Sequence, residues 1–305
     1  MRIAYIILAH KLPEQLVRLV CMLNSEGASF FIHIDKKADD ETYRMMREPL
    51  STYENVRFLN RLVIKYANFS HLQASLEGIQ EVVSSGIQYD YVILLTGQDY
   101  PIKSNEYIQQ FLGDRNGKSF IDYFSLPSNE HWQNENGGLD RINYWHFDIF
   151  WRRFAFPRKV RSEQSFSDHL LSSFSGMFLA RRILPLNYKL FGGSAYWCLS
   201  RECIEYLRKF ILENDGFVRF FHYVLIPDEI FFQTVLLNSP LRDTLVNDNM
   251  RCINWSGNWH PDIFRLEDLN HFMKTDGLFA RKFDMSEDSM VLDKIDQAIS
   301  SHNRV

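Results

Sequence analysis

The chain has 305 residues, enough for one large α/β unit or about two domains of average size. It is 46% hydrophobic and 24% charged, the usual mixture of a folded globular protein, and this excludes a disordered chain. The net charge of −4 gives no sign of the broad positive surface that nucleic-acid binding requires, so no nucleic-acid partner is expected.

The first 110 residues alternate between apolar runs and amphipathic stretches. Continuous apolar runs predict strands at residues 3–9, 29–34, 56–59 and 91–96, and helical periodicity predicts helices that begin near Pro13 and span about 71–84. A strand–helix–strand order of this kind predicts a parallel sheet. The functional edge of such a sheet lies at the carboxyl ends of its strands.

The second part of the chain is less regular. From about residue 125 to 185 the periodicity fails, and a basic, aromatic stretch over 141–161 predicts long ordered loops, which are usually functional. Regular patterns return with a strand at 195–199, helices at about 201–212, 228–237 and 266–275, and a tail from 286 with a short amphipathic helix. We expect one α/β domain over residues 1–305, without a linker.

The cysteines and the N-terminus indicate the compartment. The cysteines lack any CxxC or Cys/His spacing, which argues against zinc, so we expect reduced and mostly buried thiols at Cys21, Cys198, Cys203 and Cys252. The apolar run at the N-terminus is too short for a signal peptide or a membrane span, and no run of about 18 apolar residues follows. We expect a soluble, cytoplasmic protein, with peripheral association at the inner face of a membrane left open.

Several motifs that define a chemistry are absent from the sequence. There is no GxGxxG after the first strand and no GxxxxGK[ST], so a dinucleotide or P-loop site would lack its phosphate cradle. There is also no GxSxG and no HExxH. A DxD carboxylate pair, which holds a divalent cation in many sugar-nucleotide enzymes, is missing too. If the substrate is a sugar diphosphate, something other than a metal must neutralise its leaving group, and no metal site is expected.

Each of three motifs has both a functional and a structural interpretation, and the sequence pattern alone does not separate them. Asp35 ends a buried strand, where a carboxylate can bond a ribose hydroxyl or a uracil edge, or can cap a turn. Asp99 lies in a predicted tight turn over residues 97–101, either near a ligand or bonded only to backbone amides. Arg281 and Lys282 lie between apolar residues, as a diphosphate clamp or as a solvated pair.

A fourth motif, Asp228 and Glu229 after Pro227, begins the predicted helix over 228–237. Acidic residues in a first turn usually complement the helix dipole. Glu229 would instead suit a general base if the helix held it rigidly at a cleft. That requires the apolar face of the helix to be buried, namely Ile230, Phe231, Val235 and Leu236.

Six segments stand in a fixed order between about residues 3 and 284. They are YIILAH at 5–10, FIHID at 31–35, LTGQDYPI at 95–102, GSAY at 193–196, DEIFF at 228–232 and FARKFD at 279–284. Taken together they resemble the core-2/I-branching β-1,6-N-acetylglucosaminyltransferases and the related peptide O-xylosyltransferases. The segment INWSG at 253–257 is more similar to the xylosyltransferases.

The resemblance implies a GT-A-like fold, which is a Rossmann-like mixed sheet flanked by helices. It implies an inverting, metal-independent transfer of N-acetylglucosamine or xylose from a UDP-sugar to a glycan or glycolipid hydroxyl, in the synthesis of surface polysaccharides or glycoconjugates. No cofactor is implied beside the donor substrate. Within the single domain we expect a nucleotide-sugar half over about 1–125, an acceptor half with long loops over about 126–285, and a tail over 286–305.

The resemblance also assigns residues by position. Glu229 matches the catalytic base, and the remaining donor-site residues it implies are His10, Asp35, Asp99, Ser194, Arg281 and Lys282. Acceptor contacts are expected from Arg141, Tyr144, Asp228 and Trp255. Aromatic faces and forked cations suit sugar rings and acidic glycans. The branching enzymes carry a further arginine where this chain has Trp259 and His260, which leaves a second phosphate contact from that position open.

Two alternatives remain at this stage. A noncatalytic sugar- or nucleotide-binding module on the same scaffold would not need Glu229 as a base. A metal-dependent nucleotidyltransferase would need a carboxylate pair for Mg²⁺, and the sequence offers no suitable one. The released product separates the enzymes, because a glycosyltransferase releases UDP and a nucleotidyltransferase releases pyrophosphate.

Overall fold

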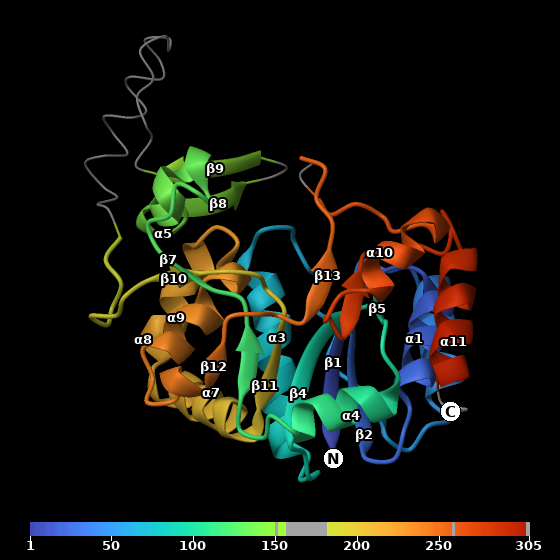
Figure 1. Cartoon of the computed structure of the whole chain (residues 1–305). Coiled ribbons are helices and arrows are strands. Elements are labelled where there is room, and N and C mark those ends of the chain that lie inside the picture. The colour runs from blue at the N-terminus through green and yellow to red at the C-terminus, as the bar shows by residue number, and fades with distance from the viewer. Residues whose placement is uncertain (150–151, 157–181, 258–259, 303–305) are drawn as a thin grey trace.

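The computed structural model describes residues 1–149, 152–156, 182–257 and 260–302 (Figure 1). A seven-stranded sheet runs through its centre in the order β12-β6-β11-β4-β1-β2-β3. Its strands are Ile3–Ala9 (β1), Ala28–Ile34 (β2), Val56–Phe58 (β3), Tyr91–Thr96 (β4), Ser119–Ile121 (β6), Trp197–Ser200 (β11) and Leu245–Val246 (β12). β1 to β4 run parallel, and β11 is antiparallel to β4 and β6. The predicted mixed α/β sheet is confirmed.

The carboxyl ends of β1, β2 and β4 meet at one edge of this sheet. β1 pairs with β2 over its whole length and with β4 on its other side. Just past the strands, the N–H of Asp35 donates to the carbonyl of Ala9 (2.9 Å), and the N–H of Gly97 donates to that of Leu8 (3.0 Å). Motifs far apart in the sequence therefore lie side by side at this edge.

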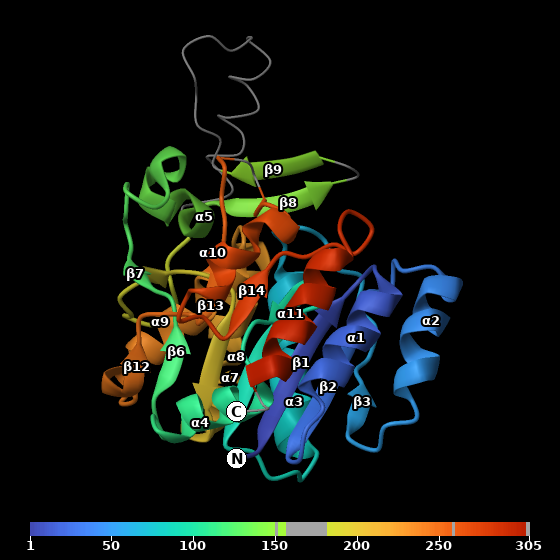
Figure 2. The same cartoon turned by 45° about the vertical axis from the view of Figure 1, so that its right-hand side comes forward.

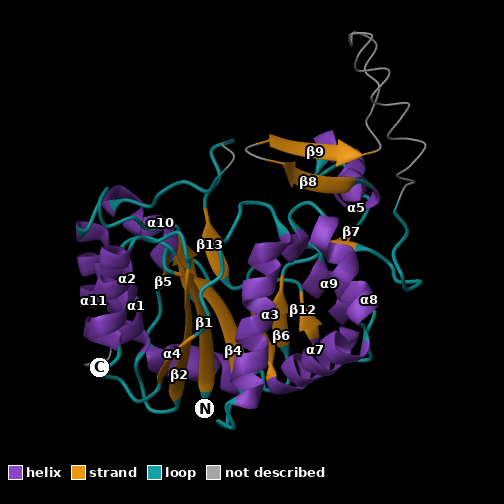
Figure 3. Ribbon diagram, turned by 180° about the vertical axis from the view of Figure 1, so that it is seen from behind, coloured by secondary structure: helices purple, strands orange, loops and turns teal. Residues whose placement is uncertain are grey.

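Helices cover both faces of the sheet and build two hydrophobic cores. Figure 2 shows one face, with Pro13–Leu23 (α1), Asp40–Leu50 (α2), Asn105–Gly113 (α4), Leu269–Met273 (α10) and Met290–His302 (α11). Figure 3 shows the other face, with Phe69–Ser84 (α3), Arg201–Glu213 (α7), Asp215–Phe220 (α8) and Phe231–Leu237 (α9). Neighbouring residues of β1 enter different cores, Ile7 the first and Ile6 the second. Burial on both faces explains why the strand is apolar throughout.

The predicted helix over residues 228–237 is in fact two pieces. Residues Pro227–Glu229 form a 3₁₀ turn (η3), and α9 follows after Ile230, whose φ of −132° is not helical. The turn is held by a bond from the Glu229 N–H to the Ile226 carbonyl (3.2 Å). The prediction of one continuous helix is wrong at this point. Glu229 is the last residue of a tight turn rather than part of the first turn of an α-helix.

The predicted anchoring of this segment is confirmed. All four apolar side chains named from the sequence are fully buried, namely Ile230, Phe231, Val235 and Leu236. Because α9 is fixed in the second core, the short turn before it is fixed as well. Glu229 is thus presented by a rigid element.

A second, smaller sheet joins distant parts of the chain. It consists of Arg251–Ile253 (β13), Phe279–Arg281 (β14) and Asp99–Pro101 (β5), in the order β13-β14-β5. The sequence predicted only a turn over residues 97–101, whereas the structure has the strand β5 there. In the antiparallel pairing of β14 with β5, Arg281 stands opposite Asp99.

Several shorter elements connect these strands and helices. The described parts of the irregular stretch hold the hairpin Trp145–Ile149 (β8) and Arg152–Phe156 (β9), the pair Phe124–Ser125 (β7) and Phe191–Gly192 (β10), and Leu139–Asn143 (α5). The further 3₁₀ turns are Gln133–Gly138 (η1), Phe221–Tyr223 (η2), Arg242–Thr244 (η4) and Leu266–Asp268 (η5). Figure 1 shows the hairpin above the edge at which β1 ends.

The C-terminal helix is part of the core rather than a loose tail. Val291 and Leu292 of α11 are fully buried, and Arg18 of α1 pairs with Asp293 (2.7 Å) and Asp296 (2.6 Å). The prediction for the thiols is also confirmed, since all four cysteines are free and Cys21 alone among them is exposed. Among the described residues, no helix is long and apolar enough to cross a membrane.

Candidate active site

Glu229 is held by an arginine that contacts two carboxylates. Nη1 of Arg141, from α5, donates to Oε2 of Glu229 at 2.7 Å, and Nε of Arg141 donates to Glu135 in η1. The Arg141 guanidinium also lies 3.7 Å from the centre of the Trp132 ring. The sequence named Glu229 and Arg141, but Glu135 and Trp132 were missed because the stretch from 128 to 140 shows no periodicity.

The backbone beside Glu229 is fixed by the Gly193–Tyr196 motif of the sequence. The Gly193 N–H donates to the Glu229 carbonyl at 2.9 Å. Only glycine fits at position 193, because the Cβ of any other residue would collide with the backbone carbonyl of Asp122. The Ser194 N–H donates to Asp122 Oδ2 (2.8 Å), and the Ser194 carbonyl accepts from Gln233 Nε2 (2.7 Å). Ser194 is therefore half-buried at the centre of this framework.

Burial sets the protonation of the acidic pair in η3. Burial raises the pKa of Glu229 from 4.5 to about 7, against the opposing pull of Arg141. Burial likewise raises the pKa of Asp228 to about 6. Oδ1 of Asp228 is buried without a hydrogen-bond partner in the protein. A carboxyl group with a pKa near 7 is well suited to take a proton from a substrate at neutral pH.

A buried ion pair lies where β5 meets β14. Asp99 is fully buried, and its Oδ1 lies 3.2 Å from Nη1 of Arg281. Asp99 also accepts a bond from the Thr96 N–H. The Arg281 guanidinium lies 4.2 Å from the centre of the Tyr196 ring, and its Nε is buried without a partner. Any effect of Asp99 on a donor would therefore act through Arg281.

Tyr196 connects this ion pair with the acidic pair. Burial raises the pKa of Tyr196, Arg281 lowers it, and the carboxylates of Asp99, Asp228 and Glu229 raise it further. The Tyr196 phenol therefore responds to the charges of both groups, and it is in direct contact with Arg281.

Lys282 lies next to a second lysine. Partial burial lowers the pKa of Lys282, and the charges of Arg281 and Lys11 lower it further. Lys11, just past β1, donates to Asp284 Oδ2 at 2.7 Å. The carboxylates of Asp284 and Asp262 oppose this effect on Lys282. Positive and negative groups thus both surround Lys282, and its contact with a phosphate stays a prediction. The sequence analysis missed Lys11, although it follows the YIILAH motif directly.

The donor residues expected from the first half lie at the sheet edge. His10 is exposed, and Asp35 is buried. Asp35 Oδ1 accepts from the N–H groups of Lys37 (2.9 Å) and Ile64 (3.3 Å), so the carboxylate shapes a turn. His71 is a neighbour of Asp35 that the sequence did not single out. Burial lowers the pKa of His71, and the charge of Asp35 only partly offsets this effect.

The expected acceptor residues are not all in one place. Arg141 and Asp228 belong to the network around Glu229, and Tyr144 is buried directly after α5. Trp255 is 57% exposed, on the loop after β13. Of the two residues at the position of the family's further arginine, Trp259 lies outside the described residues and His260 is exposed.

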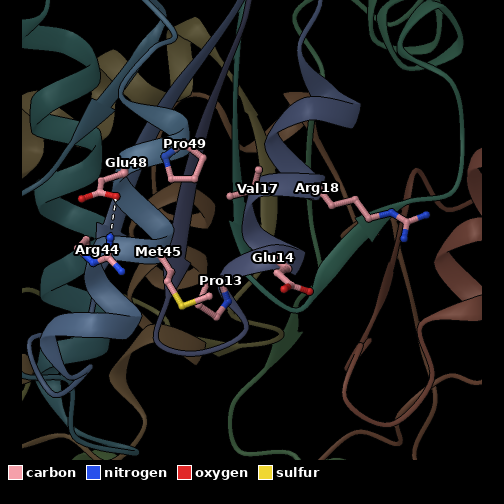
Figure 4. A pocket seen from close by; sticks show the side chains of 8 residues that line it. All are labelled: Pro13, Glu14, Val17, Arg18, Arg44, Met45, Glu48 and Pro49. Carbon is pink, nitrogen blue, oxygen red and sulfur yellow. Dashed lines mark hydrogen bonds and ion pairs between the residues drawn. The ribbon is translucent and has the colours of Figure 1, made fainter.

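A pocket of about 440 Å³ lies apart from these groups, between α1 and α2 (Figure 4). Its lining is apolar at Pro13, Val17, Met45 and Pro49, with charged side chains around them.

In the described part of the chain, no three His, Cys, Asp or Glu side chains are grouped to hold a metal ion. Independence from metal ions stays a prediction.

Comparison with known proteins identifies the family. A family model described as core-2/I-branching enzyme matches residues 3–274. The chain therefore belongs to the core-2/I-branching enzyme family.

Among curated proteins, xylosyltransferase 2 of Rattus norvegicus and of Homo sapiens are each 28% identical to this chain, and each match covers 97% of the chain and 33% of the relative. Xylosyltransferase 1 of Rattus norvegicus is 25% identical, over 97% of the chain and 35% of the relative. The chain thus spans about a third of the length of these relatives. Among solved structures, 4-diphosphocytidyl-2C-methyl-D-erythritol synthase from Anaerococcus prevotii is 12% identical with a TM-score of 0.32, over 69% of this chain and 75% of its own, which is too distant to bear on function.

Proposed function

We propose that the chain is an inverting, metal-independent glycosyltransferase that moves a sugar from a UDP-sugar to a hydroxyl of a glycan or glycolipid. Its membership in the core-2/I-branching enzyme family and its similarity to xylosyltransferases support this proposal. The observation that carries it is Glu229, a carboxyl group with a raised pKa on a short buried turn, bonded to Arg141. The mixed sheet flanked by helices agrees with a GT-A-like scaffold.

Glu229 would act as the general base. Its ionised carboxylate accepts the proton of the acceptor hydroxyl while the hydroxyl oxygen attacks the anomeric carbon of the donor. The bond from that carbon to the diphosphate oxygen breaks on the opposite side, so the configuration is inverted. Arg141 orients the carboxylate from one side, and the Gly193 N–H holds the backbone carbonyl of the same residue.

The leaving UDP would be stabilised by fixed cations. Lys282 and Arg281 follow one another at the end of β14, and Lys282 shares its surroundings with Lys11. Fixed charges placed where negative charge develops lower the barrier without reorganisation. The uridine would lie at the carboxyl edge of β1 and β2, where His10 and Asp35 are found. N-acetylglucosamine and xylose are the proposed sugars, and no further cofactor is needed.

The direct test is to incubate the purified full chain with UDP-N-acetylglucosamine, UDP-xylose and other UDP-hexoses, together with a panel of glycan and glycolipid acceptors, with and without excess EDTA. Free UDP and pyrophosphate are then separated by anion-exchange chromatography. We expect UDP release that persists in EDTA. A parallel incubation with UTP, Mg²⁺ and a sugar 1-phosphate tests the alternative, and pyrophosphate release there would favour the nucleotidyltransferase. A strict need for Mn²⁺ or Mg²⁺ for UDP release would refute the metal-independent mechanism. Binding of UDP without turnover of any donor would favour the noncatalytic module.

A further inference from the structure

One guanidinium stands between the proposed base and a second carboxylate. Arg141 is bound at two separate atoms, with Nε donating to Glu135 and Nη1 donating to Glu229. The Arg141 side chain is only 8% exposed, whereas those of Glu135 and Glu229 are 30% and 32% exposed. The arginine is thus buried, and the side chains of both acids are partly exposed. The two acids divide the charge of a single cation.

The position of Arg141 is fixed by an aromatic ring in a fitted space. Its guanidinium stacks on Trp132. A Cβ at Gly138 or at Gly192 would collide with the Trp132 ring, so only glycine leaves room for the indole. Gly138 also has a φ of 93°, which glycine adopts without strain. Two glycines, one before α5 and one in β10, therefore secure the ring against which the guanidinium packs.

We propose that Glu135 is a positioning residue for the transfer reaction. By accepting a hydrogen bond from Nε of Arg141, Glu135 fixes the arginine that orients Glu229. The negative charge of Glu135 also offsets part of the positive charge of Arg141, so that Glu229 stays basic. This inference rests on the proposed function, in which Glu229 takes the proton of the acceptor. An arginine paired with Glu229 alone would stabilise the carboxylate and make it a weaker base. A second carboxylate on the same guanidinium keeps the geometry while offsetting this effect.

The charges around Glu229 agree with this role. Besides burial, Asp228 from the same turn and Glu135 from η1 raise the pKa of Glu229, and Arg141 from α5 lowers it. The charge of Glu229 in turn raises the pKa of Tyr196, which lies in the segment before β11. Of the helices that pack against η3, α9 carries no ionisable side chain, and α3 carries His71, Glu77 and Glu81. Of the two acids that raise the pKa of Glu229, Asp228 lies in η3 itself, whereas Glu135 can be replaced without changing the sequence of η3.

The test measures the titration of Glu229 directly. The full chain is prepared with ¹³C-carboxyl-labelled glutamate, and the Glu229 resonance is assigned by its loss in Glu229→Gln. In Glu135→Gln we expect the pKa of Glu229 to fall by about one pH unit, because one negative charge is removed nearby. In Arg141→Gln it should rise. Glu130→Gln, an exposed acid in the same segment, is the matched control and should leave it unchanged.

A kinetic measurement then links the titration to the reaction. The acidic limb of the pH profile of kcat/KM for UDP release should move to lower pH in Glu135→Gln. The plateau rate should fall by about threefold, since a weaker base transfers the proton less readily. An unchanged Glu229 titration in Glu135→Gln, with normal UDP release, would refute this inference and leave the proposed function intact. Absence of UDP release from the unaltered chain would instead refute the proposed function.

Discussion

The raised pKa of Glu229 predicts that this residue lowers stability at neutral and alkaline pH. Its pKa is about 7 in the folded chain against 4.5 for a free side chain. Between these values the folded chain binds more protons at this site than the unfolded chain, so the free energy of unfolding falls as the pH rises from about 4.5 to 7. Below that window the effect is absent, and above it the full cost is present. Glu229→Gln removes the charge and should therefore stabilise the protein at pH 8.

The size of this effect follows from the pKa and the exposure. A difference of about 2.5 in pKa corresponds to about 3.4 kcal/mol. Because 32% of the Glu229 side chain is exposed, solvent screens the charge, and we expect about 1–2 kcal/mol. Arg141 keeps its bond to Glu135 in the variant, so its charge is not left unpaired.

Urea unfolding at pH 4.5 and pH 8 measures the difference. Glu229→Gln should match the unaltered chain at the lower pH and exceed its stability at the higher pH. Glu130→Gln, at an exposed position, should show no such dependence on pH. If Glu229→Gln is instead less stable than the unaltered chain at pH 8, the Glu229–Arg141 contact is a stabilising ion pair, and the argument from a raised pKa fails.

Two further variants test the cationic side of the site. Lys282→Ala should weaken UDP binding by about 1.5–3 kcal/mol in calorimetric titration and leave uridine binding nearly unchanged, because uridine has no phosphate. Equal weakening of both ligands would show that Lys282 supports the fold. Lys274→Ala, at an exposed position, serves as the control. Asp99→Asn should lower the free energy of unfolding by about 3–5 kcal/mol, because Arg281 would remain buried without its partner. A loss below 1 kcal/mol in urea unfolding would show that the arginine finds another anion or water.

Strands and helices with a strong apolar period were predictable from the sequence, and charged or short elements were not. β1 and β4 have the predicted bounds, because strands buried on both faces read as continuous apolar runs. α2 was missed because only Met46 and Leu50 of its residues are buried. The helix begins at an N-cap, where Asp39 accepts from the Thr42 N–H at 2.8 Å.

The site could be predicted in its residues but not in its connections. The segment order singled out Glu229, Arg281 and Lys282, yet nothing in the spacing showed that Asp99 pairs with Arg281. That contact depends on β5 and β14, which are three residues each and pair across 180 positions of sequence. Glu135 lies in an irregular stretch of the sequence, and its role becomes visible only through its hydrogen bond with Arg141. Long-range pairing of short elements leaves little periodic signal.

The most direct test of the central claim is the rate of UDP release, with the donor that the screen identifies, in Glu229→Gln. Glutamine keeps the shape of the side chain but cannot take the proton, so the rate should fall by about 10²–10⁴-fold while UDP affinity stays within a factor of about two. A variant that releases UDP at nearly the original rate would contradict the assignment of Glu229 as the base, and with it the mechanism proposed for this chain.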